Sequence, residues 1–527
     1  MAAAELDYDL ILEHEFDALC LDVMPRSAAN NSSSTKPVKY PAKLHARRVA
    51  TELGCDSGLV YLPGMPERPL EDSDQPQQFR QRRYFLYVAG ANFPDCHVTY
   101  DIAADRLILW IPYVEPREVL WYGSKPSAAE CMRRYDIDEA RYVSQLPKYL
   151  SLWTSAHRGR TLFALHADQT PAVESGIIDP DTRIDASLLR PAMDRARVIK
   201  TDYEVAMVRR ANDVSSAGHR KVAQLLLRLA TERDVEAVFA AVCTARGARD
   251  MAYPVIAGAG ENGSILHYGE NDQPLTGKQT MVLDAGCEWH GYASDVTRTL
   301  PIPGSWTPRA AAIHAIVESM QDQCIAGVRP GARFDHLHML AEDVAVDGLL
   351  RLGILRGDRD DIARAGTIAA FFPHYLGHHV GLEVHDVSGD LPIAAAAQGL
   401  GRGLGLDGGK RAMVTPRDSV RMRADKTAGA NGVESSTSSR TRGQQELLPN
   451  MIVTVEPGIY FCRSYLEGYY LDDPVHSRFI DADVLESYYP VGGVRIEDCI
   501  LVTRDGYENL TTAPKGRELL DVINGRA

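Results

Sequence analysis

The stretch Met281–Thr299, "MVLDAGCEWHGYASDVTRT", decides what kind of fold this chain can adopt. Asp284 ends one apolar run, Asp295 lies in the next strand-like run, and the midpoint between them falls at Trp289-His290-Gly291. Antiparallel pairing about this midpoint predicts that the two carboxylates lie opposite each other, with about 5 Å between their Cβ atoms. Because like charges repel at that distance, we expect a positive group between them.

Two further acids stand beside apolar strands. Glu456 follows "MIVTV" and precedes Pro457-Gly458, where backbone pairing should stop. Glu497 lies in "GVRIEDCILV", and Arg495, two residues earlier, shares its face of the predicted strand. Taken alone, each acid is more simply a solvated residue at a strand end. Four acids that each adjoin an apolar strand predict a shared site.

Histidines gather in residues 374–386, "HYLGHHVGLEVHD", which hold four of the sixteen histidines in the chain. A single histidine on an apolar segment is usually a hydrogen-bonded core residue, whereas four together favour a metal or acid–base site. The spacing of His374 and His378 would suit a helix. Two glycines and alternating apolar residues predict a strand instead: Gly377, Val380, Gly381, Leu382 and Val384.

Four carboxylates and one imidazole form a ligand set dominated by hard oxygen, which suits Mn²⁺ or Mg²⁺ better than a thiolate-preferring ion. Four negative charges balance two divalent ions. Two metals that share a water lower its pKa, so that hydroxide exists near neutral pH. Hydrolysis is therefore the expected chemistry.

The bulk composition sets outer limits on the function. A length of 527 residues suggests two to four domains, and a net charge of -14 argues against binding of nucleic acid. The nine cysteines are scattered and never form Cys-x-x-Cys, which fits a reducing compartment. The N-terminus carries acids where a targeting peptide would carry Lys or Arg, and no apolar run is long enough for a membrane span. We expect a cytoplasmic protein without membrane contact.

The sequence predicts three regions along the chain, two N-terminal ones and the catalytic domain. Residues 1–42 are predicted to be an N-terminal extension with a flexible, Ser/Asn/Pro-rich linker. Residues 43–190 read as a smaller α/β domain, with strands in "RRYFLYVAG" (82–90), "HVTYDI" (97–102) and "RLILWIPY" (106–113).

Residues 195–527 read as the catalytic domain. A capping box at Thr201 and Glu204 starts a helix, a second helix follows Thr231, and others are expected near 307–325 and 333–352. After residue 250, short apolar runs predict strands of a mixed sheet. Residues 393–446 contain few bulky apolar groups in their second half, which predicts a disordered insertion.

The motifs quoted above, in this order, resemble the creatinase/aminopeptidase P/prolidase family of "pita-bread" dinuclear metallopeptidases. "GAGENGSILHYGEND" (258–272) is similar to a substrate-binding strand of that family, and "RRYFLYVAGANFPDCHVTYDI" resembles its non-catalytic N-terminal domain. The closest resemblance is to the fungal-type, prolidase-like Xaa-Pro aminopeptidases. It implies an α/β (α+β) chain in which a smaller α/β domain precedes a pita-bread catalytic domain with a curved mixed sheet.

The resemblance also implies residue roles. The metal ligands would be Asp284, Asp295, His378, Glu456 and Glu497, with Asp295 and Glu497 bridging two divalent ions, most simply Mn²⁺. Glu456 would also carry a proton to the leaving amine. Substrate contacts would come from His267, His374, His385 and Arg495. The implied enzyme is a homodimeric Xaa-Pro aminopeptidase, which removes an N-terminal residue that precedes proline in a peptide by means of the metal-bridged hydroxide.

Other readings stay open. Prolidase, which hydrolyses Xaa-Pro dipeptides, shares all five ligands, and the segment between Glu456 and Glu497 resembles prolidases. A non-catalytic binding module on the same fold and metal-free creatinase-type chemistry are disfavoured because all five ligands are present. The chain departs from the family pattern at Tyr375 and His379, for which we expect packing roles, and Arg298 is expected to form a salt bridge or a helix cap.

Overall fold

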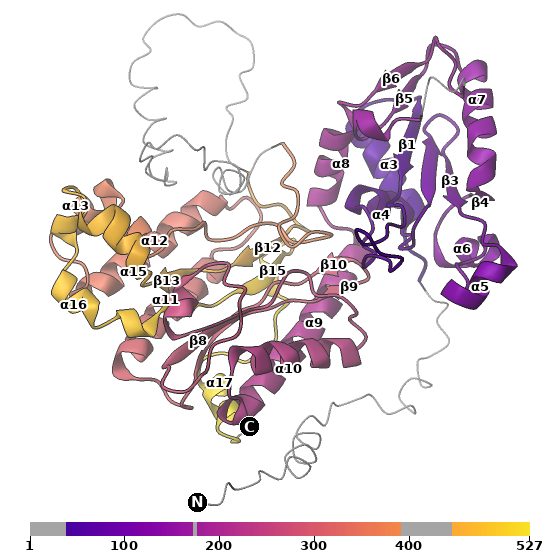
Figure 1. The fold of residues 1–527 in the computed structure, drawn as a ribbon. Helices are drawn as coiled ribbons and strands as arrows, with labels where there is room; N and C mark the ends of the chain where they lie inside the picture. The colour runs from indigo at the N-terminus through magenta and orange to yellow at the C-terminus, as the bar shows by residue number, and fades with distance from the viewer. Residues whose placement is uncertain (1–37, 172–176, 391–444, 527) are drawn as a thin grey trace, which may run out of the picture. The chain divides into compact units, whose positions relative to one another are not determined.

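The computed structural model describes residues 38–171, 177–390 and 445–526. These residues form two compact units, one of 38–199 with Val387–Asp390, and one of Lys200–Asp386 with 445–526 (Figure 1). The linker predicted within residues 1–42 and most of the insertion predicted at 393–446 lie outside the described residues. Glu446 is described, and it pairs with Arg333, so the predicted insertion reached too far at its C-terminal end.

The N-terminal unit is built on a six-stranded sheet in the order β4-β3-β2-β1-β5-β6. The pairs β1–β2 and β2–β3 are antiparallel, whereas β3–β4, β1–β5 and β5–β6 are parallel. The predicted strands at 97–102 and 106–113 are confirmed as β2 and β3. The strands are β1 (Leu59–Pro63), β2 (His97–Asp101), β3 (Arg106–Ile111), β4 (Glu139–Tyr142), β5 (Thr161–Phe163) and β6 (Arg183–Asp185).

Helices cover this sheet. Trp153 and Leu150 of α7 share a buried apolar cluster with Trp110 of β3 and Leu59 of β1, while α4 contacts β1 and β2. The helices of this unit are α3 (Ala42–Leu53), α4 (Arg83–Ala89), α5 (Pro116–Tyr122), α6 (Ala128–Arg134), α7 (Leu146–Ala156) and α8 (Leu189–Val198).

The strand predicted at 82–90 is wrong, because this segment is the helix α4. The helix ends at Gly90, which has a φ of 70° and donates its N–H to the carbonyl of Leu86 at 2.8 Å. A helix buried on nearly every side is apolar on nearly every side, so its composition matches that of a buried strand. A glycine with left-handed φ after the last helical residue is a sequence signal for a helix end, and the apolar composition of this segment obscured that signal.

The larger unit begins with two capped helices, as predicted. Glu204 accepts the N–H of Thr201 at 2.8 Å, and the carboxylate of Asp234 caps Thr231 in the same way at 2.9 Å. The helices predicted near 307–325 and 333–352 are confirmed as α11 and α12. The helices are α9 (Asp202–Leu225), α10 (Glu232–Ala245), α11 (Pro308–Ala326), α12 (Phe334–Arg351), α13 (Arg359–Ala365), α15 (Arg463–Leu466), α16 (Ala482–Glu486) and α17 (Gly516–Ile523).

The strands of this unit form the sheets β11-β8-β7 and β12-β15-β16 and the pairs β13-β14 and β10-β9. All of these named pairs are antiparallel, so the mixed pairing expected here occurs instead in the N-terminal sheet. Helices α9, α10 and α17 share one buried apolar cluster with β7, β8 and β11, and α11 contacts β12, β13 and β14. The strands are β7 (Ile256–Ala259), β8 (Thr280–Asp284), β9 (Glu288–Trp289), β10 (Tyr292–Ala293), β11 (Thr297–Pro301), β12 (Ile452–Val455), β13 (Gly458–Tyr460), β14 (Gly493–Arg495), β15 (Asp498–Val502) and β16 (Tyr507–Asn509).

The hairpin register differs from the predicted one. Asp284 lies opposite Thr297 rather than Asp295. The turn consists of His290 and Gly291, whose φ angles are 52° and 88°, and it is flanked by the pair Trp289–Tyr292. Positive φ at both central residues is the geometry of a two-residue hairpin turn. The turn centre therefore lies one residue later than assumed, which moves the partner of Asp284 by two residues.

Residues 374–386 do not form the predicted strand. They run beside β12, where Val380 donates its N–H to Ile452 and Thr454 donates to His378. Gly377 lies so close to this strand that an added Cβ would come within 2.1 Å of the carbonyl oxygen of Thr454. After Gly381 the chain bends, so the alternation of apolar residues does not reflect strand geometry.

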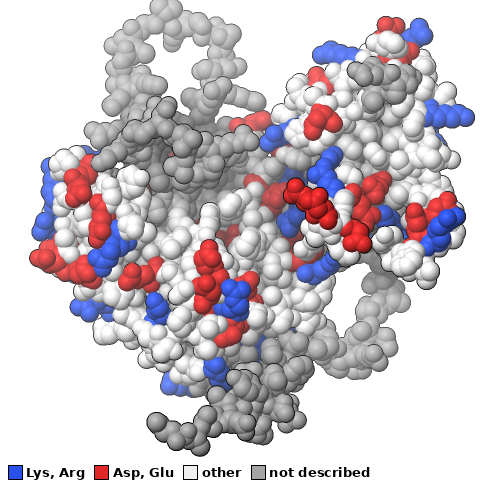
Figure 2. Space-filling view, in the orientation of Figure 1, with Lys and Arg blue, Asp and Glu red and all other residues white. Residues whose placement is uncertain are grey.

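Three features of the described residues bear on the expectations drawn from composition: surface charge, apolar helices and cysteines. In Figure 2, basic and acidic side chains are interspersed on the face that is drawn. No helix of the described chain is both long and apolar enough to cross a membrane. The eight described cysteines are all unpaired by disulfides.

We predict that Gly291→Ala lowers the free energy of unfolding, because a left-handed φ of 88° costs an L-residue about 1–2 kcal/mol. Urea unfolding followed by tryptophan fluorescence measures the change. Gly506→Ala is the control, since an added Cβ there meets no atom within 4 Å and its φ is not left-handed. Equal stabilities of the two variants would contradict the assigned turn.

Candidate metal centre

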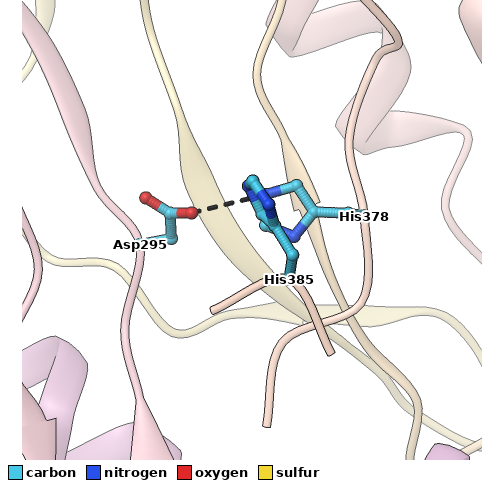
Figure 3. A group of neighbouring side chains, drawn as sticks. All are labelled: Asp295, His378 and His385. Carbon is cyan, nitrogen blue, oxygen red and sulfur yellow. Dashed lines mark ion pairs between the residues drawn. The ribbon is translucent and has the colours of Figure 1, made fainter. Parts of the chain in front are cut away.

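All five predicted metal ligands come together in the larger unit. Three overlapping groups have potential ligand atoms within 4.8 Å of one another: Asp284, Asp295 and Glu497; His378, Glu456 and Glu497; and Asp295, His378 and His385. Figure 3 shows the carboxylate of Asp295 directed at the ring of His378, with His385 beside it. The site thus contains the five expected residues and one histidine expected to contact the substrate.

The four acids lie where strands end rather than within strands. Asp284 is the last residue of β8, and Asp295 falls in the gap between β10 and β11. Glu456 follows β12 directly, and Glu497 separates β14 from β15. Regular strand structure ends at or beside each acid, while the backbone N–H groups of Glu456 and Glu497 donate to Leu376 and Thr297.

His378 is oriented as a metal ligand would be. Its Nδ1 lies 3.0 Å from the carbonyl oxygen of His379, which can only accept, so Nδ1 carries the proton. The unprotonated Nε2 then lies 3.4 Å from Asp295 and 3.3 Å from Glu456. A histidine whose outer nitrogen donates to a carbonyl while its inner nitrogen faces carboxylates is the usual arrangement at a metal.

The acids repel one another. Burial and the charge of Asp284 raise the pKa of Asp295 well above its usual range. Burial and the charge of Glu497 raise the pKa of Glu456 in the same way. Burial and the charge of Asp295 raise the pKa of Glu497. A divalent cation among these groups would oppose all three shifts, because it favours the charged form of each carboxyl.

One atom of the cluster still has unsatisfied hydrogen-bonding capacity. Oε1 of Glu497 is buried and has no hydrogen-bond partner among the described residues, while Oε2 accepts from Thr297 Oγ1 at 2.7 Å. A buried carboxylate oxygen without a partner is costly unless a cation binds it. The donor set therefore fits divalent metal.

A positive group lies beside Asp284, although not between Asp284 and Asp295 as expected. Arg495 donates to Asp284 Oδ2 at 2.7 Å, to Tyr460 Oη at 2.8 Å and to Thr297 Oγ1 at 3.2 Å. Its side chain is 4% exposed, so its charge acts in a medium of low dielectric constant. Arg495 therefore contacts Asp284 rather than Glu497, near which the sequence placed it.

The three remaining histidines surround the acids. Nδ1 of His374 lies 2.8 Å from the carbonyl oxygen of Tyr375, so its Nε2 accepts from the hydroxyl of Tyr460 at 2.8 Å. His385 is exposed, and its ring centroid lies 4.3 Å from that of His378.

Neighbouring groups lower the pKa values of His374 and His385, which keeps these two rings neutral near pH 7. Burial and Arg495 lower the pKa of His374 to about 3. Proximity to His378, together with partial desolvation by surrounding atoms, lowers the pKa of His385 to about 4, because protonation of both rings would bring two positive charges together. His267 is exposed, and its proximity contributes to the lowered pKa values of His374 and His385.

The departures from the family pattern have packing contacts. Tyr375 stacks on His338 with ring centroids 4.6 Å apart, and His379 is 2% exposed and lies 2.8 Å from Gln445. Arg298 forms a buried ion pair with Asp498 at 2.8 Å.

Sequence reasoning missed several polar residues of this site. Tyr253 donates to Asp284 Oδ1 at 2.6 Å, and Thr454 donates to Glu456 Oε1 at 3.2 Å. Glu232 is fully buried. It accepts hydrogen bonds from Ala259 and Tyr268, which flank the segment 260–267 that contains His267. Thr454 stands two residues before Glu456, so strand periodicity could have found it. Tyr253 and Glu232 had no comparable signal.

A cluster of four carboxylates and one imidazole is typical of metal-dependent hydrolases. Comparisons with known proteins identify the family within this class. The profile of metallopeptidase family M24 matches residues 206–504, and the aminopeptidase P N-terminal domain matches residues 43–163. The chain therefore belongs to metallopeptidase family M24. These matches confirm the predicted family.

Relatives and solved structures agree with this assignment. A "Probable Xaa-Pro aminopeptidase" of Metarhizium acridum is 62% identical over 98% of this chain and 99% of its own length. The one of Colletotrichum graminicola is 54% identical over 99% of both. Aminopeptidase PepP of Pseudomonas aeruginosa is 25% identical, with a TM-score of 0.71 over 93% of this chain and 99% of its own. Aminopeptidase P of E. coli with the inhibitor Pro-Leu, at 24% identity and a TM-score of 0.70, shows the same fold over 93% of this chain and 99% of its own.

We predict that Glu456→Gln stabilises the metal-free protein at pH 8 by at least about 1 kcal/mol, because each unit of raised pKa is worth roughly 1.4 kcal/mol. A carboxyl of raised pKa binds more protons when folded. Its cost is therefore absent below the unfolded pKa of about 4.3 and complete above the folded pKa. Urea unfolding after chelation, at pH 5 to 8, measures the difference.

The gain should shrink toward pH 5. Glu467→Gln, at an exposed glutamate, is the control and should show no such trend. A metal-free Glu456→Gln protein that loses stability relative to wild type as the pH rises would contradict the assigned electrostatics.

Proposed function

We propose that this protein is an Xaa-Pro aminopeptidase that uses two divalent metal ions, with Mn²⁺ as the preferred ion. The observation that carries the proposal is the convergence of Asp284, Asp295, His378, Glu456 and Glu497 within ligand distance of common points. The names of the relatives support the choice of substrate, which is a peptide with proline in the second position.

The five residues divide into two overlapping ligand sets. Asp284, Asp295 and Glu497 would hold one ion, and His378, Glu456 and Glu497 the other. Glu497 belongs to both sets, and Asp295 lies 3.4 Å from His378, which supports bridging roles for these two acids. When bound, two such ions supply a water of lowered pKa and a Lewis acid for the carbonyl.

Glu456 is the proposed proton carrier. The bond before proline is a tertiary amide, so its nitrogen has no hydrogen and must receive a proton to depart. Glu456 lies in the site, with Oε1 held by Thr454 at 3.2 Å. It can take the proton of the attacking water and deliver it to the proline nitrogen.

The histidines orient the substrate. His385 is exposed and neutral near pH 7, so it can donate one N–H to the carbonyl oxygen as negative charge develops there. His374 is held by hydrogen bonds to Tyr375 and Tyr460. His267 is the third histidine that contacts the substrate. Arg495 keeps Asp284 and Tyr460 in place.

We predict that the metal-loaded protein hydrolyses Xaa-Pro-Yaa tripeptides and that Asp295→Asn lowers kcat/KM at least about 100-fold, since it removes a ligand of the site. Release of the N-terminal amino acid, with metal content by mass spectrometry, measures both effects. Asp322→Asn, at an exposed acid paired with Lys515, is the matched control and should retain activity.

Hydrolysis of Xaa-Pro dipeptides without turnover of tripeptides would instead identify a prolidase. Full activity of Asp295→Asn would exclude the assigned site. The homodimer that the family resemblance implies stays a prediction, which light scattering tests.

A further inference from the structure

A buried ion pair outside the metal site joins the two ends of the segment Lys200–Asp386. Nζ of Lys200 lies 3.0 Å from Oδ2 of Asp386, and each side chain is only 1% exposed. We propose that Lys200 is a positioning residue that holds the loop His379–Asp386 and thereby sets the place of His385. The inference rests on the proposed function, in which His385 contacts the substrate.

The loop is closed at its base. Asp386 donates its N–H to the carbonyl of His379 at 2.9 Å, and Gly381 donates to Glu383 at 3.1 Å. The first part of the loop is anchored to strands, since Val380 donates to Ile452 of β12 and Ala293 of β10 donates to Gly381. Among the described residues no such backbone bond anchors His385 itself, which makes the closure at Asp386 the nearest fixed point of the loop.

The ion pair lies directly beneath this closure. A Cβ added at Gly381 would lie 2.2 Å from Asp386 Oδ2 and 3.0 Å from Cε of Lys200. The backbone of the loop therefore rests on both charged side chains, and only glycine leaves room for them. A change in either partner alters the packing directly beneath the loop backbone.

Lys200 is itself held firmly. It donates its N–H to the carbonyl of Asn450 at 2.8 Å, and Asn450 Nδ2 donates back to the carbonyl of Lys200 at 3.0 Å. Asn450 in turn donates to Val502 at the end of β15. The backbone of Lys200 is thus fixed relative to the sheet β12-β15-β16, beside which Glu456 and Glu497 lie.

A buried ion pair is weak evidence for stability, because desolvation offsets the attraction between the charges. Its geometric effect is more specific. Asp386 follows His385 directly, whereas His378 at the other end is anchored through Thr454. Loss of the pair should therefore displace His385 and leave the metal ligands in place.

The test compares Lys200→Met with wild type in the metal-loaded full-length protein. We expect kcat/KM for an Xaa-Pro-Yaa tripeptide to fall about 10- to 100-fold, as for other residues that orient a group of a metal site, with metal content unchanged. The rate at which diethyl pyrocarbonate modifies His385, followed by peptide mass spectrometry, should change several-fold. Lys43→Met, at a buried lysine paired with Asp138 in the N-terminal unit, is the matched control and should change neither quantity.

Lys200→Met removes the cation beside a buried carboxylate and can fail to fold, so the double variant Lys200→Met/Asp386→Asn removes both charges. We expect it to fold and still show the lowered kcat/KM and the altered modification rate. Wild-type values of both in a folded variant would overturn the inference. A wild-type protein without activity on any Xaa-Pro peptide would overturn the proposed function, while the modification rates would still test the positioning of His385.

Discussion

The mutual repulsion of four clustered carboxylates, three of them buried, is the constraint on which the larger unit depends. Burial and neighbouring negative charge raise the pKa values of Asp295, Glu456 and Glu497 together. Bringing such groups together costs free energy, which bound cations or fixed positive groups must offset. Arg495 meets part of this need at Asp284, and the partnerless oxygen of Glu497 marks where a metal would meet the rest.

The antiparallel sheets make this convergence possible because each acid stands where a strand stops. A residue in mid-strand has its backbone committed to its neighbours and its side chain directed to one face. Glu456 and Glu497 lie just outside β12 and β15, and their N–H groups donate to Leu376 and Thr297, which lie outside the β12–β15 pair. The glycine at 377 serves the same end, since it lets the histidine segment lie against Thr454 closely enough for His378 to reach the acids.

Much of the site was predictable from sequence, and the misses have physical causes. Capping boxes at Thr201 and Thr231 and the strands around Asp284 and Glu456 are local signals, and the structure contains them. The helix at Arg83–Ala89 was missed because burial on all sides erases the helical period. The hairpin register was missed because two positive φ angles at His290 and Gly291, and not the spacing of the acids, set the turn.

By itself the sequence determined the family, the two kinds of domain and the identity of the residues that gather at the metal centre. Those features rest on residue types and on spacings along one strand or one helix turn. Only the tertiary structure decided which partner each residue has: Arg495 contacts Asp284, Tyr253 joins the acids, and Lys200 pairs with Asp386. These contacts join positions far apart in the chain, and their geometry depends on how the sheets pack, which local sequence does not encode.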